Sequence, residues 1–529
     1  MDGSVRRLIA GFGLLLAWMP CSLAQERLEH KAILPKPAAP CGSRKVAVLV
    51  DPSLLQSIRK GLDQFEQDLC AIGYDTVEHS AGFADPAALR GYLQGIYKGR
   101  GGKLAGAILI GNMPHAYQWV KLVPTNPAIP PSAEEVISFQ YYADLDGTFG
   151  KSATYSSPGG HPYSYDVHSG NVGWEIWVGA LPAYKGDLQR TTAAVNRYLA
   201  RNHAYRSGKL THPNVFLQVN EHVTANTMAD HNTTMAAMRS GTYAWTPYSN
   251  STGARLYFNS PPAGLSVQQG YADLRAGVAD FTVTDTHGSW AASGQLTISA
   301  VESGPVGTVF FWSNGCATGN LDHSDNFLTS VLYSPTSDVL IAKGTTNDSG
   351  GMGNNGNGFF GHNIATALMS GASFGDAILG HVNVPLIAPW SGDREYHFAS
   401  VVILGDPTLL RLSSGGADLV PFGRPGLPGP PGFCKTAKTG QHKGELIITV
   451  TNQGNAAAPT STTLVEFSNG ARFLLPTPAI APGGSVDLPL SIPAACFRPD
   501  CSFKITVDSK GQVKETNTGN NTAAGICIG

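Results

Sequence analysis

The chain has 529 residues, with 36 Lys and Arg against 38 Asp and Glu, and only 14% of its residues are charged. This length is too great for a single domain and sufficient for a sizeable hydrophobic core. Because the charge is nearly balanced and no basic block or stripe occurs, nucleic acid is not expected as a partner.

Residues 1–24 have the pattern of a secretory signal peptide. Arg6 and Arg7 supply the positive end, Leu8 to Met19 form an apolar run, and Ser22 to Ala24 give a small-x-small cleavage site. Cys21 raises the alternative of a lipoprotein, but bulky residues precede it. The apolar run is too short for a membrane span, and no later segment is long enough. We therefore expect an exported protein, extracellular or periplasmic, without a membrane span, that begins with an N-terminal segment at 25–44.

The cysteines give a prediction that depends on export, because disulfides persist in oxidising compartments. Cys21 lies in the predicted signal peptide, which leaves seven. Six of these suggest three pairs by their positions in the chain: Cys41 with Cys70, Cys434 with Cys527, and Cys496 with Cys501. The seventh is Cys316. A small buried hydrophobe is the ordinary interpretation of a single cysteine, but Gly315 and Gly319 surround this one.

Residues 45–414 show alternating strands and helices. Lys45 to Val50 and Gly106 to Gly111 are continuous apolar runs, typical of buried strands. Between them, apolar residues recur at helical spacing from Leu55 to Leu69. Uninterrupted strands that alternate with amphipathic helices predict an α/β domain with a mostly parallel sheet covered by helices on both faces.

A Pro-, Gly- and Tyr-rich stretch within this domain contains the run from Asp144 to Gly147. Asp144 and Asp146 place two carboxylates on one side of a turn, which suits calcium. A complete calcium loop would need further ligands, and a simple Asp-rich turn is the alternative. We expect no cofactor to be required for the chemistry, and treat structural calcium as a hypothesis.

The composition changes near residue 415. Residues 415–433 are rich in Pro and Gly and predict a linker, since about three collagen-like triplets cannot form a triple helix. Residues 434–529 contain short alternating segments separated by Gly, Pro and Asn turns. This pattern predicts an all-β, immunoglobulin-like sandwich.

Two segments of the α/β domain end in residues that can carry chemistry. An apolar, β-rich run precedes His287, and a second precedes Cys316. The separation, 316 − 287 = 29 residues, is about the length of one β-crossover-β unit. Two neighbouring parallel strands would then present an imidazole and a thiol at their carboxyl ends, where ligands usually bind in open α/β sheets.

This pair indicates nucleophilic catalysis. A thiolate attacks carbonyl carbon when a nearby imidazole sets its protonation state. The tetrahedral intermediate then needs backbone N–H donors, for which the amides of Gly288 and Cys316 are the natural candidates. Glycine after the histidine would let a substrate backbone approach closely. His287 and Cys316 are therefore the predicted catalytic dyad.

Seven sequence blocks between Lys45 and Leu412 resemble the gingipain family of secreted cysteine peptidases, which has the caspase-like fold. The blocks are Gly111-Asn112-Met113-Pro114, Tyr141-Tyr142-Ala143-Asp144-Leu145-Asp146-Gly147, Val178-Gly179 with Leu181-Pro182-Ala183, Thr286-His287-Gly288-Ser289-Trp290, Gly315-Cys316-Ala317-Thr318-Gly319, Gly371-Ala372-Ser373-Phe374-Gly375-Asp376-Ala377, and Leu404-Gly405-Asp406-Pro407-Thr408-Leu409-Leu410.

The resemblance implies a cysteine endopeptidase that acts on proteins or peptides, with Cys316 as nucleophile and His287 as base. It also implies an acid that contacts the histidine, for which Glu221 is similar in position. Arginine-specific members have an acid at the base of the primary pocket, and Asp230 is the nearest candidate. An aromatic residue of that pocket is expected around Asn347, where this chain has no tryptophan.

The last module resembles a bacterial cell-adhesion-related immunoglobulin-like domain, through Ile447, Thr449, Val450, Asn452, Gly454 and the run from Val507 to Asn521. Such a domain implies contact with a cell surface, spacing or added stability. An alternative function from another class is a caspase-fold adhesin or binding protein that has lost catalysis. The presence of both His287 and Cys316 favours the peptidase.

Overall fold

The computed structural model describes residues 41–42, 44–80, 82–99, 103–122, 132–221, 254–258, 266–347, 364, 367–368, 371–383, 398–413, 415–423, 432–436 and 444–529. The predicted signal peptide, most of the N-terminal segment and Asp230 lie outside these ranges. Within them, no helix is long and apolar enough to cross a bilayer.

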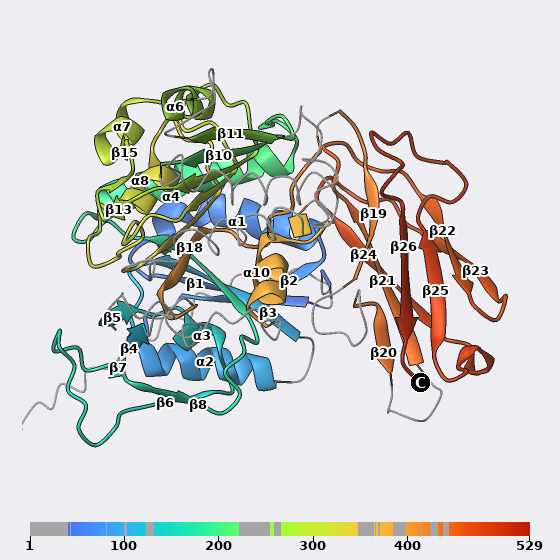
Figure 1. Ribbon diagram of the computed structural model, residues 1–529, viewed down its shortest axis with the longest axis horizontal. Coiled ribbons are helices and arrows are strands. Elements are labelled where there is room, and N and C mark those ends of the chain that lie inside the picture. Colours follow the sequence, from blue (N-terminus) through green and yellow to red (C-terminus); the bar gives the residue numbers. More distant parts are fainter. Residues whose placement is uncertain are drawn as a thin grey trace, which may run out of the picture. The chain divides into compact units, whose positions relative to one another are not determined.

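A ten-stranded sheet forms the centre of the α/β domain in the described part of the chain (Figure 1). Its strands, from one edge to the other, are β11 (Ala254–Phe258), β10 (Phe216–Asn220), β12 (Phe281–Asp285), β16 (Phe310–Ser313), β17 (Ile341–Thr345), β18 (Val401–Gly405), β9 (Trp177–Pro182), β3 (Lys103–Gly111), β1 (Arg44–Val50) and β2 (Tyr74–His79).

The sheet consists of two parallel blocks. The five strands from β11 to β17 are mutually parallel, and so are the five from β18 to β2. The blocks meet at β17 and β18, which pair antiparallel from Ile341 opposite Gly405 to Thr345 opposite Val401. The predicted mostly parallel α/β sheet is confirmed, and the one antiparallel junction sets the two blocks in opposite directions.

Helices cover both faces of the sheet, as predicted. They are α1 (Leu55–Ala71), α2 (Pro86–Lys98), α3 (Gln140–Ala143), α4 (Leu188–Arg206), α6 (Val267–Arg275), α7 (Ile298–Ser303), α8 (Phe327–Tyr333) and α10 (Phe374–Val382). Alternation along β16 shows the two faces directly. Phe311 contacts Phe327 of α8, whereas Phe310 and Trp312 contact Phe374 of α10.

Local sequence explains these elements. In α1, the apolar residues Leu55, Ile58, Leu62, Phe65 and Leu69 recur on one face, and all five are buried. Helix α2 begins with Pro86, where a missing N–H costs nothing, and the Asp85 carboxylate accepts the amide of Ala88. Strand β1 is apolar on both faces and fully buried from Val46 to Val50, as expected beneath helices on both sides.

Within the described ranges, three small sheets extend from the domain. They are β4 (Tyr117–Leu122) with β5 (Ser132–Ile137) and β7 (Ser164–Tyr165), β6 (Thr148–Gly150) with β8 (Val167–Ser169), and β13 (Gly288–Ser289) with β14 (Ala292–Ser293) and β15 (Leu296–Thr297). The last of these follows His287 directly.

The C-terminal part is an antiparallel β-sandwich, which confirms the predicted all-β module. One sheet contains β19 (Leu419–Phe422), β21 (Gly444–Asn452), β20 (Cys434–Thr436) and β24 (Ser485–Ser491). The other contains β23 (Arg472–Thr477), β22 (Ser461–Phe467), β25 (Cys501–Thr506) and β26 (Thr522–Cys527). Strand β19 lies within the stretch 415–433, so the sandwich takes a strand from this Pro- and Gly-rich segment.

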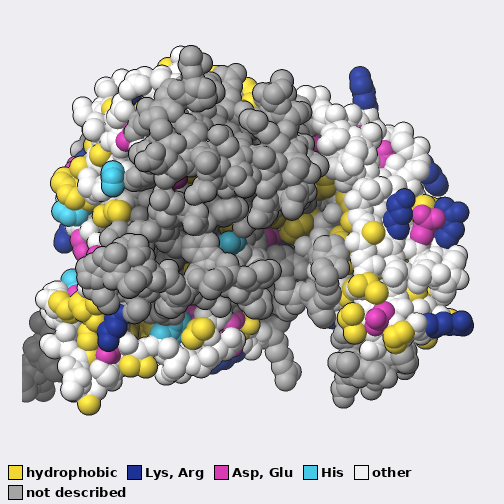
Figure 2. Space-filling model, viewed as in Figure 1, with side chains coloured by type: hydrophobic (Ala, Val, Ile, Leu, Met, Phe, Trp, Pro, Cys, Tyr) yellow, Lys and Arg dark blue, Asp and Glu magenta, His cyan; other side chains and the backbone are white. Residues whose placement is uncertain are grey.

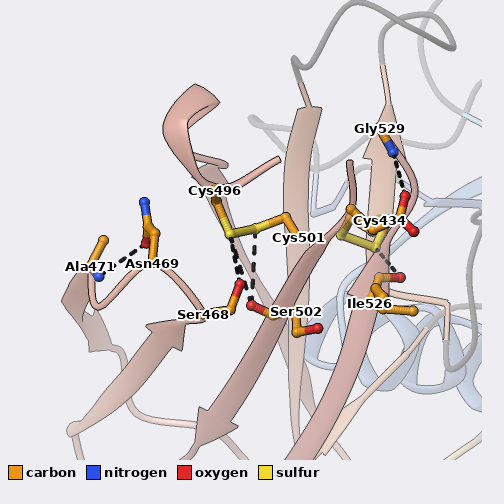
Figure 3. Close-up of a disulfide and its surroundings, with 11 residues drawn as sticks. Cys434, Ser468, Asn469, Ala471, Cys496, Cys501, Ser502, Ile526 and Gly529 are labelled. Atoms are coloured by element: carbon orange, nitrogen blue, oxygen red, sulfur yellow. Dashed lines mark hydrogen bonds between the residues drawn. A yellow bond between two sulfur atoms is a disulfide. The ribbon is translucent and has the colours of Figure 1, made fainter. Parts of the chain in front are cut away.

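Three disulfides join the pairs that the sequence suggested. Cys41 is bonded to Cys70, and the other two bonds lie in the sandwich, where Figure 3 shows them. Cys434 on β20 is bonded to Cys527 on β26, and therefore ties one sheet to the other. Cys496 and Cys501 close a short turn. Among the described cysteines, Cys316 is the one outside these three disulfides.

Charged side chains of the described residues are scattered over the face shown in Figure 2. They lie among uncharged atoms, in keeping with the low proportion of charged residues in the sequence.

Candidate active site

Four neighbouring strands bring the predicted site residues to one edge of the sheet. β10, β12, β16 and β17 are adjacent and parallel, so their carboxyl ends lie at the same edge. Glu221 follows β10 directly, His287 follows the end of β12, Cys316 follows β16 and Asn347 follows β17. The prediction that the histidine and cysteine strands are parallel neighbours is thus confirmed.

The pairing of β12 with β16 keeps His287 and Cys316 in register. Thr284 lies opposite Ser313, a separation of 313 − 284 = 29 residues that equals 316 − 287. The amide of Asn314 donates to the Thr284 carbonyl at 2.8 Å and carries the ladder one step beyond the strands. The two segments therefore leave the sheet side by side.

Beyond the strands, Gly288 packs directly on the peptide between Gly315 and Cys316. A Cβ atom on Gly288 would lie 2.5 Å from the Gly315 carbonyl carbon and 2.6 Å from the Cys316 nitrogen. Such separations are far below van der Waals contact, so position 288 admits only glycine without a shift of the loop. From the sequence, we expected this glycine to let a substrate backbone approach closely. The structure gives a second reason for glycine, which is the contact between the two loops.

The turn that carries Cys316 is held by the end of β17. The amide of Ala317 donates to the Asn347 carbonyl at 2.6 Å, and the amide of Gly319 donates to the Thr345 carbonyl at 2.9 Å. Ala317 has a φ of 56°, in the left-handed region that non-glycine residues seldom adopt. Strained backbone of this kind often occurs at functional turns. Asn347, a predicted pocket residue, thus supports the cysteine turn through its backbone.

The two predicted dyad residues differ in exposure. His287 is exposed, and Cys316 is half-buried. Both side chains are therefore within reach of solvent, as a reaction with an external substrate requires.

Glu221 lies one strand away from the histidine. Its amide donates to the Asp285 carbonyl at 2.9 Å. Its carboxylate accepts the hydroxyl of Tyr271 at 2.8 Å and the amide of Gln295 at 3.2 Å. Burial and the neighbouring Glu221 charge raise the pKa of Tyr271, so this phenol remains a donor.

The Glu221 carboxylate also abuts Gly294. A Cβ on that glycine, which has a φ of +58°, would lie 2.5 Å from a carboxylate oxygen. The Gly294 amide in turn donates to the His287 carbonyl at 2.7 Å. Glu221 therefore packs against the turn that holds the histidine backbone.

An aromatic pair connects the two loops at the surface. Trp290, which is 42% exposed, stacks on His323 with 4.4 Å between ring centroids and 9° between planes. The Trp290 carbonyl also accepts the Phe327 amide at 2.6 Å. His323 lies in the loop before α8. The adjacent Asp322 accepts the Tyr117 hydroxyl at 2.7 Å.

A buried lysine lies beneath this edge, and sequence reasoning did not identify it. Lys343 on β17 is 1% exposed, and its ammonium lies 4.6 Å from the centre of the Trp312 ring. Its Nζ makes no hydrogen bond with any described residue. Burial lowers the pKa of Lys343 to about 7, partly offset by the charge of Asp285. Trp312 donates its Nε1–H to Asn314 at 2.7 Å. The sequence signal that could have identified it is a lysine within an otherwise apolar strand, because lysine is seldom fully buried.

A third carboxylate lies beside the turn that was predicted to suit calcium. Ligand atoms of Asp144, Asp146 and Glu175 all lie within 4.8 Å of one another. Burial raises the pKa of Glu175 to about 7, with the charges of Asp146 and Asp144 adding to the effect. The donor set is three carboxylates, as hard cations prefer.

Several oxygens of this turn already have protein partners. Asp144 accepts the Gly147 amide and contacts His168 Nε2 at 2.6 Å. The guanidinium of Arg90 donates to the carbonyls of Asp144 and Gly147. A cation here would therefore bind the carboxylates of Asp146 and Glu175 and the lone pairs of Asp144 that have no protein partner. The carbonyls that accept from Arg90 would not be ligands.

Two family models match parts of this chain. The model described as "Peptidase family C25" matches residues 55–411, and the model described as "CARDB" matches residues 435–525. Among curated proteins, no match is significant.

Similar solved structures include two of gingipain. The Arg-specific cysteine proteinase gingipain R has 12% sequence identity and a TM-score of 0.49, over 94% of this chain and 99% of that one. The complex of Porphyromonas gingivalis RgpB pro- and mature domains has 12% identity and a TM-score of 0.47, over 92% and 99%. A CARDB domain from Pyrococcus furiosus, solved with di-metal ions, has 20% identity and a TM-score of 0.17, over 23% and 96%.

Proposed function

The chain belongs to peptidase family C25, and on that basis we propose that it is a secreted cysteine endopeptidase with Cys316 as nucleophile and His287 as base. The observation that carries the proposal is the packing of Gly288 on the Gly315–Cys316 peptide. This contact, together with the shared register of β12 and β16, keeps the imidazole-bearing and thiol-bearing loops adjacent.

The chemistry would proceed in two steps. In the first, His287 takes the Cys316 proton, the thiolate attacks the scissile carbonyl carbon, and His287 returns the proton to the leaving amine. In the second, His287 takes a proton from water and the hydroxide attacks the acyl carbon. The carbon–sulfur bond then breaks to release the acid, and His287 returns the proton to the Cys316 sulfur. No cofactor is needed for either step.

Backbone donors and one acid complete the proposed site. The amides of Gly288 and Cys316 would stabilise the oxyanion of each tetrahedral intermediate. Glu221 would orient the histidine, a role supported by its position after the neighbouring strand and its contact with Gly294. Asp230, the proposed acid of the primary pocket, lies outside the described residues, so preference for Arg or Lys before the scissile bond rests on the family resemblance alone.

Export and a surface role form the second part of the proposal. The three disulfides favour an oxidising compartment, either extracellular or periplasmic. Proteins or peptides are the expected substrates, and the CARDB domain is a candidate for contact with a cell surface.

The decisive experiment combines thiol labelling with a peptide library. We expect Cys316 to be alkylated in the folded protein, the wild type to cleave casein and library peptides, and Cys316→Ala to abolish cleavage. Hydrolysis that persists in Cys316→Ala would remove the assigned nucleophile. An unreactive Cys316 and no cleavage would favour the alternative, a non-catalytic adhesin or binding protein on the same fold.

A further inference from the structure

Four side-chain hydroxyls meet in the interior beneath the two loops of the site. The central one belongs to Ser293 on β14, whose side chain is fully buried. Its Oγ lies 3.0 Å from Thr284 Oγ1, 2.9 Å from Thr286 Oγ1 and 3.0 Å from Ser313 Oγ. Thr284 belongs to the histidine strand, and Ser313 ends the cysteine strand. The cluster therefore joins the two strands and the hairpin that follows His287.

The proton positions in this cluster follow from counting donors. A hydroxyl donates one hydrogen bond and accepts two. Thr286 donates to the His287 carbonyl at 3.0 Å, so its bond with Ser293 must use the Ser293 proton. Ser293 then has two lone pairs left, which accept the protons of Thr284 and Ser313. All three partners of Ser293 are thereby satisfied.

This assignment gives one directed chain between the two loops. The amide of Gly315 donates to Ser313 at 3.2 Å. Ser313 donates to Ser293, Ser293 donates to Thr286, and Thr286 donates to the His287 carbonyl. The chain begins one residue before Cys316 and ends on the backbone of His287. Buried chains of this kind strengthen through mutual polarisation.

Two further contacts tie the same hairpin to both loops. The amide of Gly294, the residue after Ser293, donates to the His287 carbonyl at 2.7 Å. A Cβ on Gly315 would lie 3.2 Å from Ser293 Oγ, so the hydroxyl also packs against the cysteine loop. Ser293 is thus in contact with the backbone on each side of the proposed dyad.

We propose that Ser293 is a positioning residue that sets the alignment of His287 with Cys316 through this hydrogen-bond chain. The inference rests on the proposed function, since it assigns Ser293 to the same site. Removal of the hydroxyl would leave two donors and one acceptor without partners in the interior, and such groups move to find new partners. The loops would shift relative to each other, and small misplacements of reacting groups slow chemistry strongly.

The test is the pH dependence of Cys316 alkylation by iodoacetamide. In this reaction the thiolate forms a carbon–sulfur bond and expels iodide, so the rate follows ionisation of the thiol. We expect Ser293→Ala to move the midpoint of the rate profile towards the ordinary thiol value of about 8.5. For peptide hydrolysis, kcat should fall by about ten- to hundredfold, with KM changed by less than about twofold.

Three variants separate positioning from stability. Thr286→Val removes the last link of the chain with little change of shape, and it should shift the alkylation profile in the same direction. Thr284→Val removes a hydroxyl that also binds Ser293 but lies outside the chain. Ser334→Ala removes a buried hydroxyl that donates to the Val301 carbonyl at 3.0 Å, at the end of α8. The last two should lower the melting temperature and leave the alkylation profile unchanged.

The outcomes distinguish this inference from the peptidase proposal. If Ser293→Ala and Thr286→Val fold and alkylate with the wild-type profile, Ser293 does not position the dyad. If Thr284→Val and Ser334→Ala shift the profile equally, the effect is one of general stability, and the inference also fails. If the wild type hydrolyses no peptide, the peptidase proposal fails, while the alkylation profiles still measure the role of Ser293. Should Ser293→Ala not fold, Thr286→Val decides.

Discussion

Gly288 lies so close to Gly315 that a Cβ atom on Gly288 would come within 2.5 Å of the Gly315 carbonyl carbon. The histidine and cysteine loops thus touch through backbone, one residue from each proposed dyad member. This contact leaves no room for a side chain at position 288. Glycine is therefore required there for packing against the cysteine loop, in addition to the close approach of a substrate backbone.

Gly288→Ala is expected to separate the loops. The new methyl group must push the Gly315–Cys316 peptide away, which should lower peptide hydrolysis by about a hundredfold and reduce the free energy of unfolding by about 1–3 kcal/mol. Steady-state kinetics and urea unfolding measure the two effects. Gly95→Ala is the matched control. Gly95 lies in α2 with open space around it, so this change should raise stability by about 0.5–1 kcal/mol and leave hydrolysis unchanged. Full activity in Gly288→Ala would contradict the packing argument.

Glu221→Gln tests the proposed orienting acid. The amide oxygen can still accept from Tyr271 and Gln295, so folding should be little affected, while the negative charge is lost. We expect kcat to fall by about ten- to hundredfold with an unchanged melting temperature. Tyr271→Phe is the control, because it removes a hydrogen bond to the same carboxylate but keeps its charge. Equal activity in Glu221→Gln and the wild type would leave Glu221 without a catalytic role.

Lys343→Met should stabilise the protein, and more so at low pH. The pKa of Lys343 is about 7 in the fold against 10.5 for an ordinary lysine. Between these values the unfolded chain binds more protons than the native one, so this group makes stability rise with pH from about 7 to 10.5. The gain in Lys343→Met should therefore be largest below pH 7, on the order of several kcal/mol, and should vanish above about pH 10.5. Urea unfolding of both proteins at pH 6 and pH 9 checks this, and equal gains at the two pH values would refute it.

Calcium is expected to stabilise the Asp144, Asp146 and Glu175 cluster in a pH-dependent manner. The pKa of Glu175 is raised from 4.5 to about 7 in the fold. The unfolded chain therefore binds fewer protons in that window, and this group makes stability fall as the pH rises through it. A cation would relieve the repulsion of the ionised form. Added CaCl2 should raise the melting temperature more at pH 8 than at pH 5.5, and Glu175→Gln should reduce the effect.

A melting temperature that does not respond to calcium or chelator at pH 8 would leave the cluster as a hydrogen-bonded turn. The wild type and Glu175→Gln should be compared at equal ionic strength, because general screening also relieves repulsion between carboxylates.

The Cys434–Cys527 disulfide should stabilise the sandwich more than the Cys496–Cys501 disulfide. The first spans 93 residues and the second 5, and a cross-link removes more unfolded-state entropy when its loop is longer. Replacing both cysteines of a pair by alanine should cost roughly 2–3 kcal/mol more for the long loop. Guanidinium unfolding of the full chain measures this, with peptide hydrolysis as a check that the α/β domain is intact. An equal cost for both pairs would show that native strain or residual structure dominates.

Much of the fold followed from local sequence. The continuous apolar run that ends at Val50 and the helical stripe from Leu55 to Leu69 predicted a buried strand and a helix, because periodicity reports which face of an element is covered. The sequence also predicted the three disulfides, since chain position and module boundaries left few plausible partners. Neither prediction required knowledge of distant contacts.

Other features had no local signal. The antiparallel junction of β17 with β18 joins two parallel blocks, and strand direction at a junction depends on packing across the whole sheet. Glu175 joins the carboxylates of Asp144 and Asp146 from a position 29 residues after Asp146. Such a residue becomes a neighbour only when the chain has folded.

The sequence by itself determined the family, the two-module plan and the identity of the proposed dyad, because these depend on residue types in order along the chain. Tertiary structure alone decided why Gly288 must be glycine, how the hydroxyls of Ser293 and Thr286 connect the two loops, and that Lys343 lies buried beside Trp312. These are relations between segments that are remote or only loosely linked along the chain. Their energies come from close packing and from desolvation, and both exist only in the folded protein.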